Sequence, residues 1–143
     1  MNLTREQKRK IKEIGKKFNL KLILLHGSFA SGKNKFGSDL DVAVLGKKPI
    51  EFEKLLKIHG DLADVFGDNQ NRELDLKSLY KTDPLFCYQV AKTSQLLYGN
   101  ITDYSEFRAY TFANFFDSQD LFRLEKRLID KFQNYLNRKY KYA

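Results

Sequence analysis

Two aspartates separated by one residue, Asp39 and Asp41, open the apolar run LDVAVL. On an extended strand, side chains two positions apart leave the same face, with their backbones about 6.6 Å apart. Carboxylates at that spacing repel each other, which destabilises the fold unless a cation lies between them. Hard cations such as Mg²⁺ prefer oxygen ligands. The pair therefore predicts a site for two Mg²⁺ ions about 4 Å apart. The simpler alternative for an isolated Asp-x-Asp is a polar sheet edge that faces water.

A third acid, Asp75, lies near the start of the run RELDLKSL, which alternates apolar and polar residues as a half-exposed strand does. If this strand lies beside LDVAVL, Asp75 can join the same metal cluster. It could also accept the proton of an attacking hydroxyl, because a bound metal lowers the pKa of that hydroxyl. Glu73, on the same face, is the rival candidate.

A possible phosphate-binding bend, Gly27-Ser28, ends the apolar run LKLILLHG that precedes the acids. Glycine lets the backbone approach a phosphate closely, and free N–H groups at the start of a helical turn favour an anion. The Ser28 hydroxyl can donate to a phosphate oxygen, and Lys33 and Ser38 in the following loop are further candidates. His26 is expected mainly to close the strand end. A Gly-Ser pair alone is more often a simple turn.

The rest of the chain must supply the elements that position these side chains. We predict an α/β (α+β) fold, a small mixed sheet flanked by helices, as one domain over residues 1–143. The expected elements are a helix opened by a capping box at Thr4–Gln7, strands over 20–25, 40–45, 72–79 and 95–99, a helix over 52–66, and a helix after Asp83-Pro84. A C-terminal helical extension is expected from about Asp103, with a break near Asp117–Asp120.

Positive charge is concentrated at the two ends of the chain, which has a net charge of +8. Residues 1–22 carry eight Lys or Arg and two acids, residues 123–143 carry seven and two, and the middle carries eleven and fourteen. A nucleic-acid patch is one reading of the ends. Solvated, lysine-rich helix faces are the favoured reading, so direct nucleic-acid binding stays open.

A cytoplasmic protein without membrane contact is expected. No run approaches the roughly 20 apolar residues of a membrane span, and the N-terminal stretch MNLTREQKRKIK lacks the apolar segment of a secretory signal. Cys87 is the single cysteine and therefore cannot form a disulfide within the chain. It is expected to be a buried, inert thiol.

The chain combines Gly-Ser, a glycine-rich loop, Ser-Asp-x-Asp on a strand, and a third strand acid. This combination resembles the pattern of the nucleotidyltransferase superfamily that includes DNA polymerase beta. The runs GSFASGKNKFGSDLDVAVL and ELDLKSLYKTDPLFCYQVAKTSQLLYG more closely resemble the minimal nucleotidyltransferase antitoxins (MntA-like), the partners of HEPN ribonuclease toxins. The resemblance covers roughly Leu20 to the end of the chain and is most specific over Gly27–Asp41.

The resemblance implies a polymerase beta-like fold and a metal-dependent protein adenylyltransferase. In such proteins Gly-Ser, here Gly27 and Ser28, holds the triphosphate of ATP. The Asp-x-Asp pair, here Asp39 and Asp41, binds two Mg²⁺ ions, and the third acid, here Asp75, lies on the neighbouring strand. Such an antitoxin transfers AMP from ATP to a tyrosine of its HEPN toxin, and this blocks RNA cleavage by the toxin.

The chain departs from many members of this family at Ser31, where they carry an arginine. Lys33 and Lys35 can supply positive charge there, although lysine is a point charge and not a bidentate fork. HEPN toxins are recognised by the motif Arg-x₄₋₆-His. Neither His26 nor His59 has an arginine at that distance before it, so the chain is not expected to be the toxin.

Two other functions stay open at this stage. One is a small-molecule nucleotidyltransferase of the antibiotic-modifying type, although no second domain for an acceptor pocket is evident. The other is a non-catalytic module that binds a toxin or RNA, although a pure binder gains nothing from three clustered carboxylates. An aromatic-rich stretch suits either the core or a partner interface; it comprises Tyr104, Phe107, Tyr110, Phe112, Phe115, Phe116 and Phe122.

Overall fold

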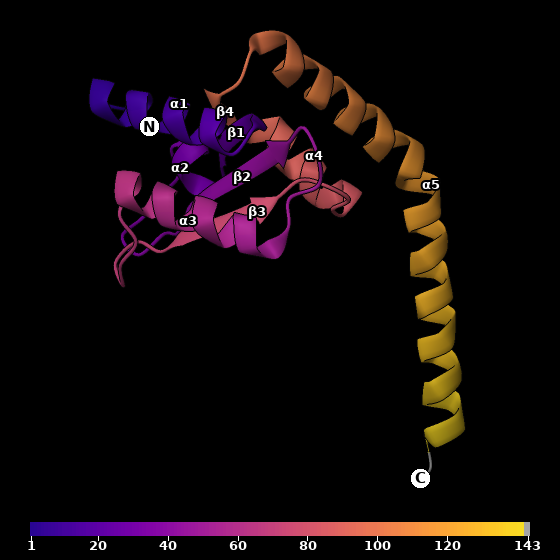
Figure 1. The fold of residues 1–143 in the computed structure, drawn as a ribbon. Coiled ribbons are helices and arrows are strands. Elements are labelled where there is room, and N and C mark those ends of the chain that lie inside the picture. The colour runs from indigo at the N-terminus through magenta and orange to yellow at the C-terminus, as the bar shows by residue number, and fades with distance from the viewer. Residues whose placement is uncertain (142–143) are drawn as a thin grey trace.

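A four-stranded sheet with helices on both faces forms the body of the protein in the computed structural model, which describes residues 1–141 (Figure 1). The elements are α1 (Arg5–Lys17), β1 (Leu20–His26), α2 (Ser28–Ser31), β2 (Leu40–Gly46), α3 (Phe52–Phe66), β3 (Leu74–Ser78), α4 (Pro84–Thr93), β4 (Gln95–Tyr98) and α5 (Ile101–Tyr140). This confirms the mixed sheet, the flanking helices and the long C-terminal helix expected from the sequence.

Local sequence signals set the start of two helices, as predicted. The Thr4 hydroxyl accepts a hydrogen bond from the Gln7 N–H at 3.1 Å, and the Gln7 side chain accepts one from the Thr4 N–H at 3.0 Å. The Asp83 carboxylate accepts from the Leu85 N–H at 3.1 Å. Pro84 follows at the first helical position, where no N–H is needed. These caps satisfy N–H groups that have no partner within their own helices.

The sheet has the strand order β3-β2-β1-β4. Strand β1 pairs antiparallel with both β2 and β4, whereas β2 pairs parallel with β3. The central strand β1 is covered on both faces, so Leu22–Leu25 are all fully buried. This double burial explains why its sequence is a continuous apolar run and does not alternate.

Two helical layers cover the sheet. Helices α1 and α3 pack on the face that carries Ile23, Leu25, Leu40, Val42 and Val44. Helix α4 and the first part of α5 pack on the opposite face, which carries Leu22, Leu24 and Ala43. Because side chains alternate along a strand, Asp41 leaves β2 on the same face as Ala43. The acid of β2 therefore lies on the α4 side of the sheet.

Helix α5 is continuous over its 40 residues, so the expected break near Asp117–Asp120 is wrong. The helix bends and its second half extends away from the sheet (Figure 1). The segment 101–140 contains neither proline nor glycine, and aspartates inside a helix cost only a fraction of a kcal/mol each. Within residues 1–141, neither α5 nor any other helix is apolar enough over its length to cross a membrane.

The aromatic-rich stretch is divided between core and surface. Tyr104 is buried, and Phe107 packs against the same cluster. Other rings meet Tyr88 of α4, with Phe115 stacked on it at a centroid distance of 4.0 Å and Phe112 edge-on at 5.7 Å. Two rings stay exposed, Tyr110 at 73% and Phe116 at 60%. The surplus of aromatic residues therefore fixes α5 to α4 in part and remains open to solvent in part.

Candidate active site

The aspartates of β2 and β3 are direct neighbours. Asp41 and Asp75 are register partners in the parallel β2–β3 pair, and adjacent strands lie about 4.8 Å apart. Parallel partners point to the same face, so both carboxylates lie on the α4 side of the sheet. Glu73 lies one residue before β3 and is exposed. Of the two acids proposed as the third member of the cluster, the structure therefore favours Asp75.

The Asp41 carboxylate lies directly against Gly27. A Cβ atom on Gly27 would be 2.2 Å from Asp41 Oδ2, which is far inside van der Waals contact. Gly27 has φ 72° and ψ −152°, a backbone conformation that is essentially restricted to glycine. The chain can therefore bring the Gly27–Ser28 bend and the acid of β2 together only because residue 27 has no side chain.

Negative charge accumulates at this place, which we call the acidic site (Asp39, Asp41 and Asp75). Burial raises the pKa of the Asp41 carboxyl above its usual value, and the neighbouring Asp75 and Asp39 raise it further, while Lys77 opposes them. Neighbouring carboxylates disfavour the ionised form of such a carboxyl, and a cation that binds there stabilises that form by relieving the repulsion. The acidic site therefore has the chemistry that a divalent metal requires.

Asp39 lies one residue before β2 and is exposed, so it belongs to the loop end and not to the strand itself. Within residues 1–141, no three His, Cys, Asp or Glu side chains converge closely enough to form a ready-made metal site. The donor set nevertheless fits Mg²⁺, which takes one or two carboxylates and completes its shell with water and phosphate oxygens.

The residues proposed to bind phosphate lie in the segment between β1 and β2. The Ser28 hydroxyl makes no hydrogen bond to any part of the chain that the structure describes, so it is available to a ligand. The Ser38 hydroxyl accepts from the Lys35 N–H at 2.8 Å and thereby closes the turn before Asp39. The Lys33 side chain is exposed, and its N–H donates to the Ser28 carbonyl at 2.9 Å. Phosphate binding by Gly27, Ser28, Lys33 and Ser38 stays a prediction.

One charged residue of the site, Lys77, was missed from the sequence. Its Nζ lies 3.7 Å from Asp75 Oδ2 and 5.3 Å from the ring centroid of Phe86. Lys77 is two positions after Asp75 in β3, so the alternation in ELDLKSL already placed both on one face. Lys77 partly offsets the negative charge of the acidic site.

His26 joins the same corner of the site. It is the register partner of Asp41, and its ring meets Phe86 edge-on at 5.7 Å. Burial lowers the pKa of the imidazole, although the nearby Asp75 acts in the opposite direction. The buried Nε2 has no hydrogen-bond partner among residues 1–141. His26 therefore closes the strand end, as expected, as a neutral ring that adds no charge to the acidic site.

Two side chains fix the backbone next to Asp75. Asp68 Oδ1 accepts from the Leu74 N–H at 3.0 Å, and His59 Nε2 lies 3.0 Å from the Leu74 carbonyl oxygen. Both backbone groups of Leu74 are therefore satisfied from the α3 side of the sheet. His59 therefore has a structural role, and together with Asp68 it holds the start of β3 next to Asp75.

Asp68→Ala should lower the free energy of unfolding by about 1–2 kcal/mol, because the Leu74 N–H loses its acceptor beside a buried side chain. Urea unfolding of this variant beside Asp64→Ala measures the difference. Asp64 is exposed on α3 and makes no interaction with the described chain. Equal stability of the two variants would contradict a bracing role for Asp68.

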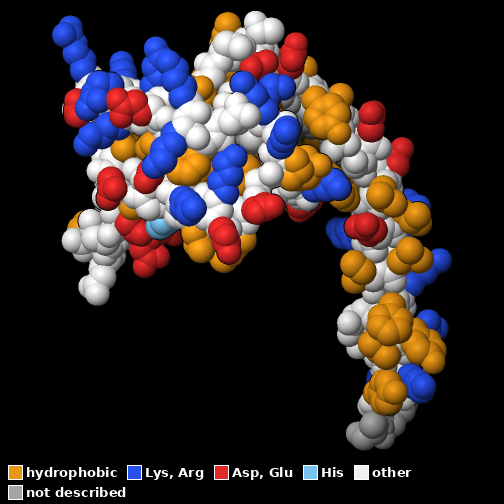
Figure 2. Space-filling view, in the orientation of Figure 1, with side chains coloured by type: hydrophobic (Ala, Val, Ile, Leu, Met, Phe, Trp, Pro, Cys, Tyr) orange, Lys and Arg blue, Asp and Glu red, His pale blue; other side chains and the backbone are white. Residues whose placement is uncertain are grey.

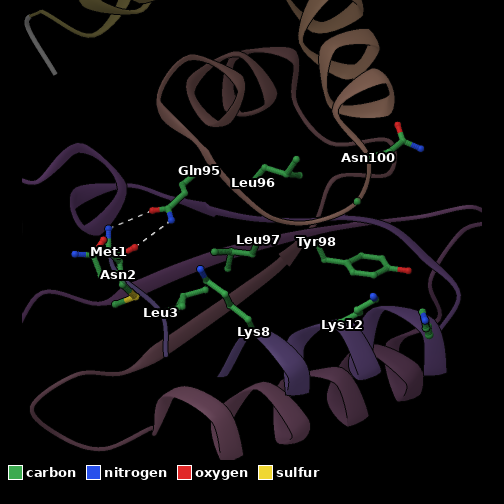
Figure 3. Close-up of a pocket in the computed structure, with 12 residues that line it drawn as sticks. Met1, Asn2, Leu3, Lys8, Lys12, Gln95, Leu96, Leu97, Tyr98 and Asn100 are labelled. Atoms are coloured by element: carbon green, nitrogen blue, oxygen red, sulfur yellow. Dashed lines mark hydrogen bonds between the residues drawn. The ribbon is translucent and has the colours of Figure 1, made fainter. Parts of the chain in front are cut away.

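A surface groove lies away from the three acids. It runs between α1 and the free edge of β4 and holds about 940 Å³. Figure 3 shows Lys8 and Lys12 along one side, with Leu97 and Tyr98 opposite and the backbone of Met1 bonded to Gln95. None of the three acids lines this groove. The catalytic assignment therefore rests on charge and strand register and not on the shape of a pocket.

Cys87 takes no part in the acidic site. The thiol is half-buried, whereas it was expected to be buried, and its Sγ lies 2.8 Å from Thr82 Oγ1. Burial raises the pKa of the thiol. Since the thiolate is the reactive form, Cys87 is poorly suited to act as a nucleophile.

The sequence also matches a known protein family. The sequence profile of the family described as "Polymerase beta, Nucleotidyltransferase" matches residues 9–103, which include the three acids and the Gly27–Ser28 bend. A search of curated proteins found no significant match.

Solved structures share the fold over most of the chain. A chain of a toxin–antitoxin complex with AMP-PNP superposes with a TM-score of 0.68 at 25% identity, covering 88% of this chain and 98% of its own. A chain from the complex of tri-AMPylated HEPN toxin with MNT antitoxin of Shewanella oneidensis gives 0.64 at 23% identity, with 90% and 98% covered. A spectinomycin adenyltransferase from Enterococcus faecialis, bound to ATP and spectinomycin, gives 0.53 at 20%, with 73% and 59% covered.

Proposed function

The chain belongs to the polymerase beta nucleotidyltransferase family, and from this premise we propose that it is an antitoxin that transfers AMP from ATP to a tyrosine of a HEPN ribonuclease toxin. The observation that carries the catalytic part is the close approach of Gly27 to the carboxylate of Asp41, which is itself the register partner of Asp75. The partner class rests on the 25%-identical chain from a toxin–antitoxin complex with AMP-PNP, which covers nearly all of this fold.

In this proposal the Gly27–Ser28 bend holds the triphosphate through backbone N–H groups and the Ser28 hydroxyl. The acids Asp39, Asp41 and Asp75 hold two Mg²⁺ ions, which when bound neutralise the triphosphate and polarise its α-phosphorus. Gly27 has no side chain that would separate the phosphates from the carboxylates. The fixed strands β2 and β3 keep the acids in place while the acceptor approaches.

The reaction forms one bond and breaks another at the α-phosphorus. The tyrosine oxygen of the acceptor bonds to that phosphorus, and the bond from phosphorus to the bridging oxygen of pyrophosphate breaks. Pyrophosphate leaves with the electron pair, and the tyrosine proton passes to the carboxylate of Asp75, the candidate base. No cysteine or histidine nucleophile is needed, consistent with a half-buried Cys87 and a neutral His26.

Label transfer from ATP tests the proposal. With a HEPN protein as acceptor, ³²P in the α position of ATP should appear on the acceptor and ³²P in the γ position should not. Replacement of the acceptor tyrosine by phenylalanine should remove the signal. Tight binding of the HEPN protein without label transfer would instead identify a non-catalytic binding module.

The likeness to spectinomycin adenyltransferase defines a second acceptor class for the same assay. That match leaves about two fifths of the antibiotic enzyme without a counterpart in this chain. We therefore expect no label on spectinomycin. Label on the antibiotic together with an unlabelled HEPN protein would reassign the acceptor while keeping the transferase chemistry.

A further inference from the structure

The second half of α5 presents a large apolar surface that the rest of the protein leaves uncovered. We call residues 121–140 the α5 tail. From Arg123 to Lys141 every residue except Leu136 is exposed. The exposed apolar side chains of the tail are Leu121, Leu124, Leu128, Ile129, Phe132, Tyr135 and Tyr140, each between 51% and 67% accessible. Figure 2 shows them along the free part of the helix.

These side chains share one side of the helix. Leu121, Leu128 and Tyr135 recur at intervals of seven residues, and Leu124 and Phe132 lie three or four positions from them. Residues at such spacings are neighbours on a helix surface. Twenty helical residues span about 30 Å. An apolar strip of that length is more than an isolated monomer usually exposes, and it marks an interaction surface.

The charge of the tail restricts what can cover this strip. Residues 121–141 carry seven Lys or Arg and two acids. A second copy of the tail would bring the same positive charge alongside, which is unfavourable. A partner with acidic residues around an apolar groove would complement both the strip and its basic flanks.

A single acid distinguishes a protein partner from a membrane. Glu125 lies four residues after Leu121 and three or four before Leu128 and Ile129, so it sits within the apolar strip. Its carboxylate makes no bond within residues 1–141. Lipid tails offer a carboxylate no hydrogen-bond donor, and burying it there is costly. A protein groove can place an arginine, a lysine or a hydroxyl opposite it.

We infer that the α5 tail is the docking surface for the protein acceptor, through an apolar groove with an acidic rim and one donor opposite Glu125. This inference rests on the proposed function only in taking the acceptor to be a protein. Docking through a helix remote from the acidic site separates recognition of the acceptor from the chemistry.

Paired substitutions on the two sides of the tail test the inference. The variant Leu121→Asp with Leu128→Asp adds two acids to the strip. The control, Asn134→Asp with Asn137→Asp, adds two acids to the opposite, polar side. Binding of the HEPN protein, measured by calorimetry on full chains of equal helix content, should weaken about 100-fold in the first variant and less than about threefold in the control.

The kinetic readout separates docking from catalysis. The strip variant should raise KM for the protein acceptor and leave the affinity for ATP unchanged. Wild-type affinity and KM in that variant would overturn the docking surface while leaving the transferase intact. Loss of binding in the strip variant, in a protein whose wild type transfers no AMP, would keep the docking surface and overturn the proposed chemistry.

Glu125→Leu distinguishes the competing occupants. Docking to a protein predicts weaker acceptor binding, because the donor opposite Glu125 loses its partner. A lipid occupant predicts that wild type binds vesicles containing phosphatidylserine and that Glu125→Leu binds them more tightly. A second copy predicts a wild-type dimer in analytical ultracentrifugation that the strip variant dissociates. If wild type binds vesicles or forms a dimer in this way, and the strip variant keeps its affinity for the acceptor, the inference is overturned.

Discussion

Asp41→Asn should abolish AMP transfer and at the same time make the metal-free protein slightly more stable. Asparagine keeps the size of the side chain but removes the charge that a divalent metal needs, so we expect at least a 1,000-fold loss, on the order of removing a central electrostatic group. The substitution also removes a carboxylate opposite Asp75, and like charges at directly opposed strand positions cost about 0.2–1 kcal/mol. Transfer of α-³²P and urea unfolding without divalent ions measure the two effects.

The stability difference between Asp41→Asn and wild type should depend on pH in a definite direction. The pKa of Asp41 is raised in the folded chain, mainly by burial and then by Asp75 and Asp39. The ionised carboxyl therefore opposes folding at neutral pH, and that cost is relieved as the pH falls through the raised pKa. Without metal, the stability advantage of Asp41→Asn should shrink as the pH falls through this range, and Mg²⁺ should stabilise wild type more than the variant.

Glu73→Gln is the matched control for Asp41→Asn. Glu73 is exposed just before β3, and its side chain makes no bond within residues 1–141. This variant should keep both wild-type transfer and wild-type stability. Full transfer by Asp41→Asn, or its loss in Glu73→Gln, would show that the acids of the site are wrongly assigned.

Features that local sequence encodes were predicted well. The capping box at Thr4 and the proline start of α4 were confirmed because each rests on residues within four positions of one another. The placement of Asp75 beside Asp41 was also confirmed. Asp41 and Asp75 are each the second residue of a strand. They become neighbours because β2 and β3 pair in parallel with these positions in register.

Several other features that depend on contacts between separate elements were not predicted. Lys77 was overlooked although it lies two positions after Asp75 in β3, and its contact with the Phe86 ring comes from the separate helix α4. The bracing of Leu74 by His59 and Asp68 joins three elements that the sequence does not link. The expected break in α5 was wrong because Asp117 and Asp120 are accommodated within the helix and no glycine or proline accompanies them.

The second large effect is expected for Gly27→Ala, which should lose transfer by about 100- to 1,000-fold and lower the free energy of unfolding by about 1–3 kcal/mol. The energetic part follows from φ 72° and ψ −152°, a conformation that alanine adopts only under strain. The catalytic part follows from the Cβ atom, which would meet Asp41 Oδ2 at 2.2 Å and force the carboxylate to move. Displacing a catalytic group by about 1 Å costs on the order of 100-fold.

Gly32→Ala separates these two effects, because Gly32 also has a positive φ of 75° but its added Cβ would have no atom within 4 Å. This variant should lose about 1 kcal/mol of stability from the left-handed backbone alone and keep most of its transfer. If backbone strain in this segment were the whole cause, both variants would lose transfer alike. If only Gly27→Ala loses it, the close approach of the bend to the Asp41 carboxylate is what places the triphosphate against the acids.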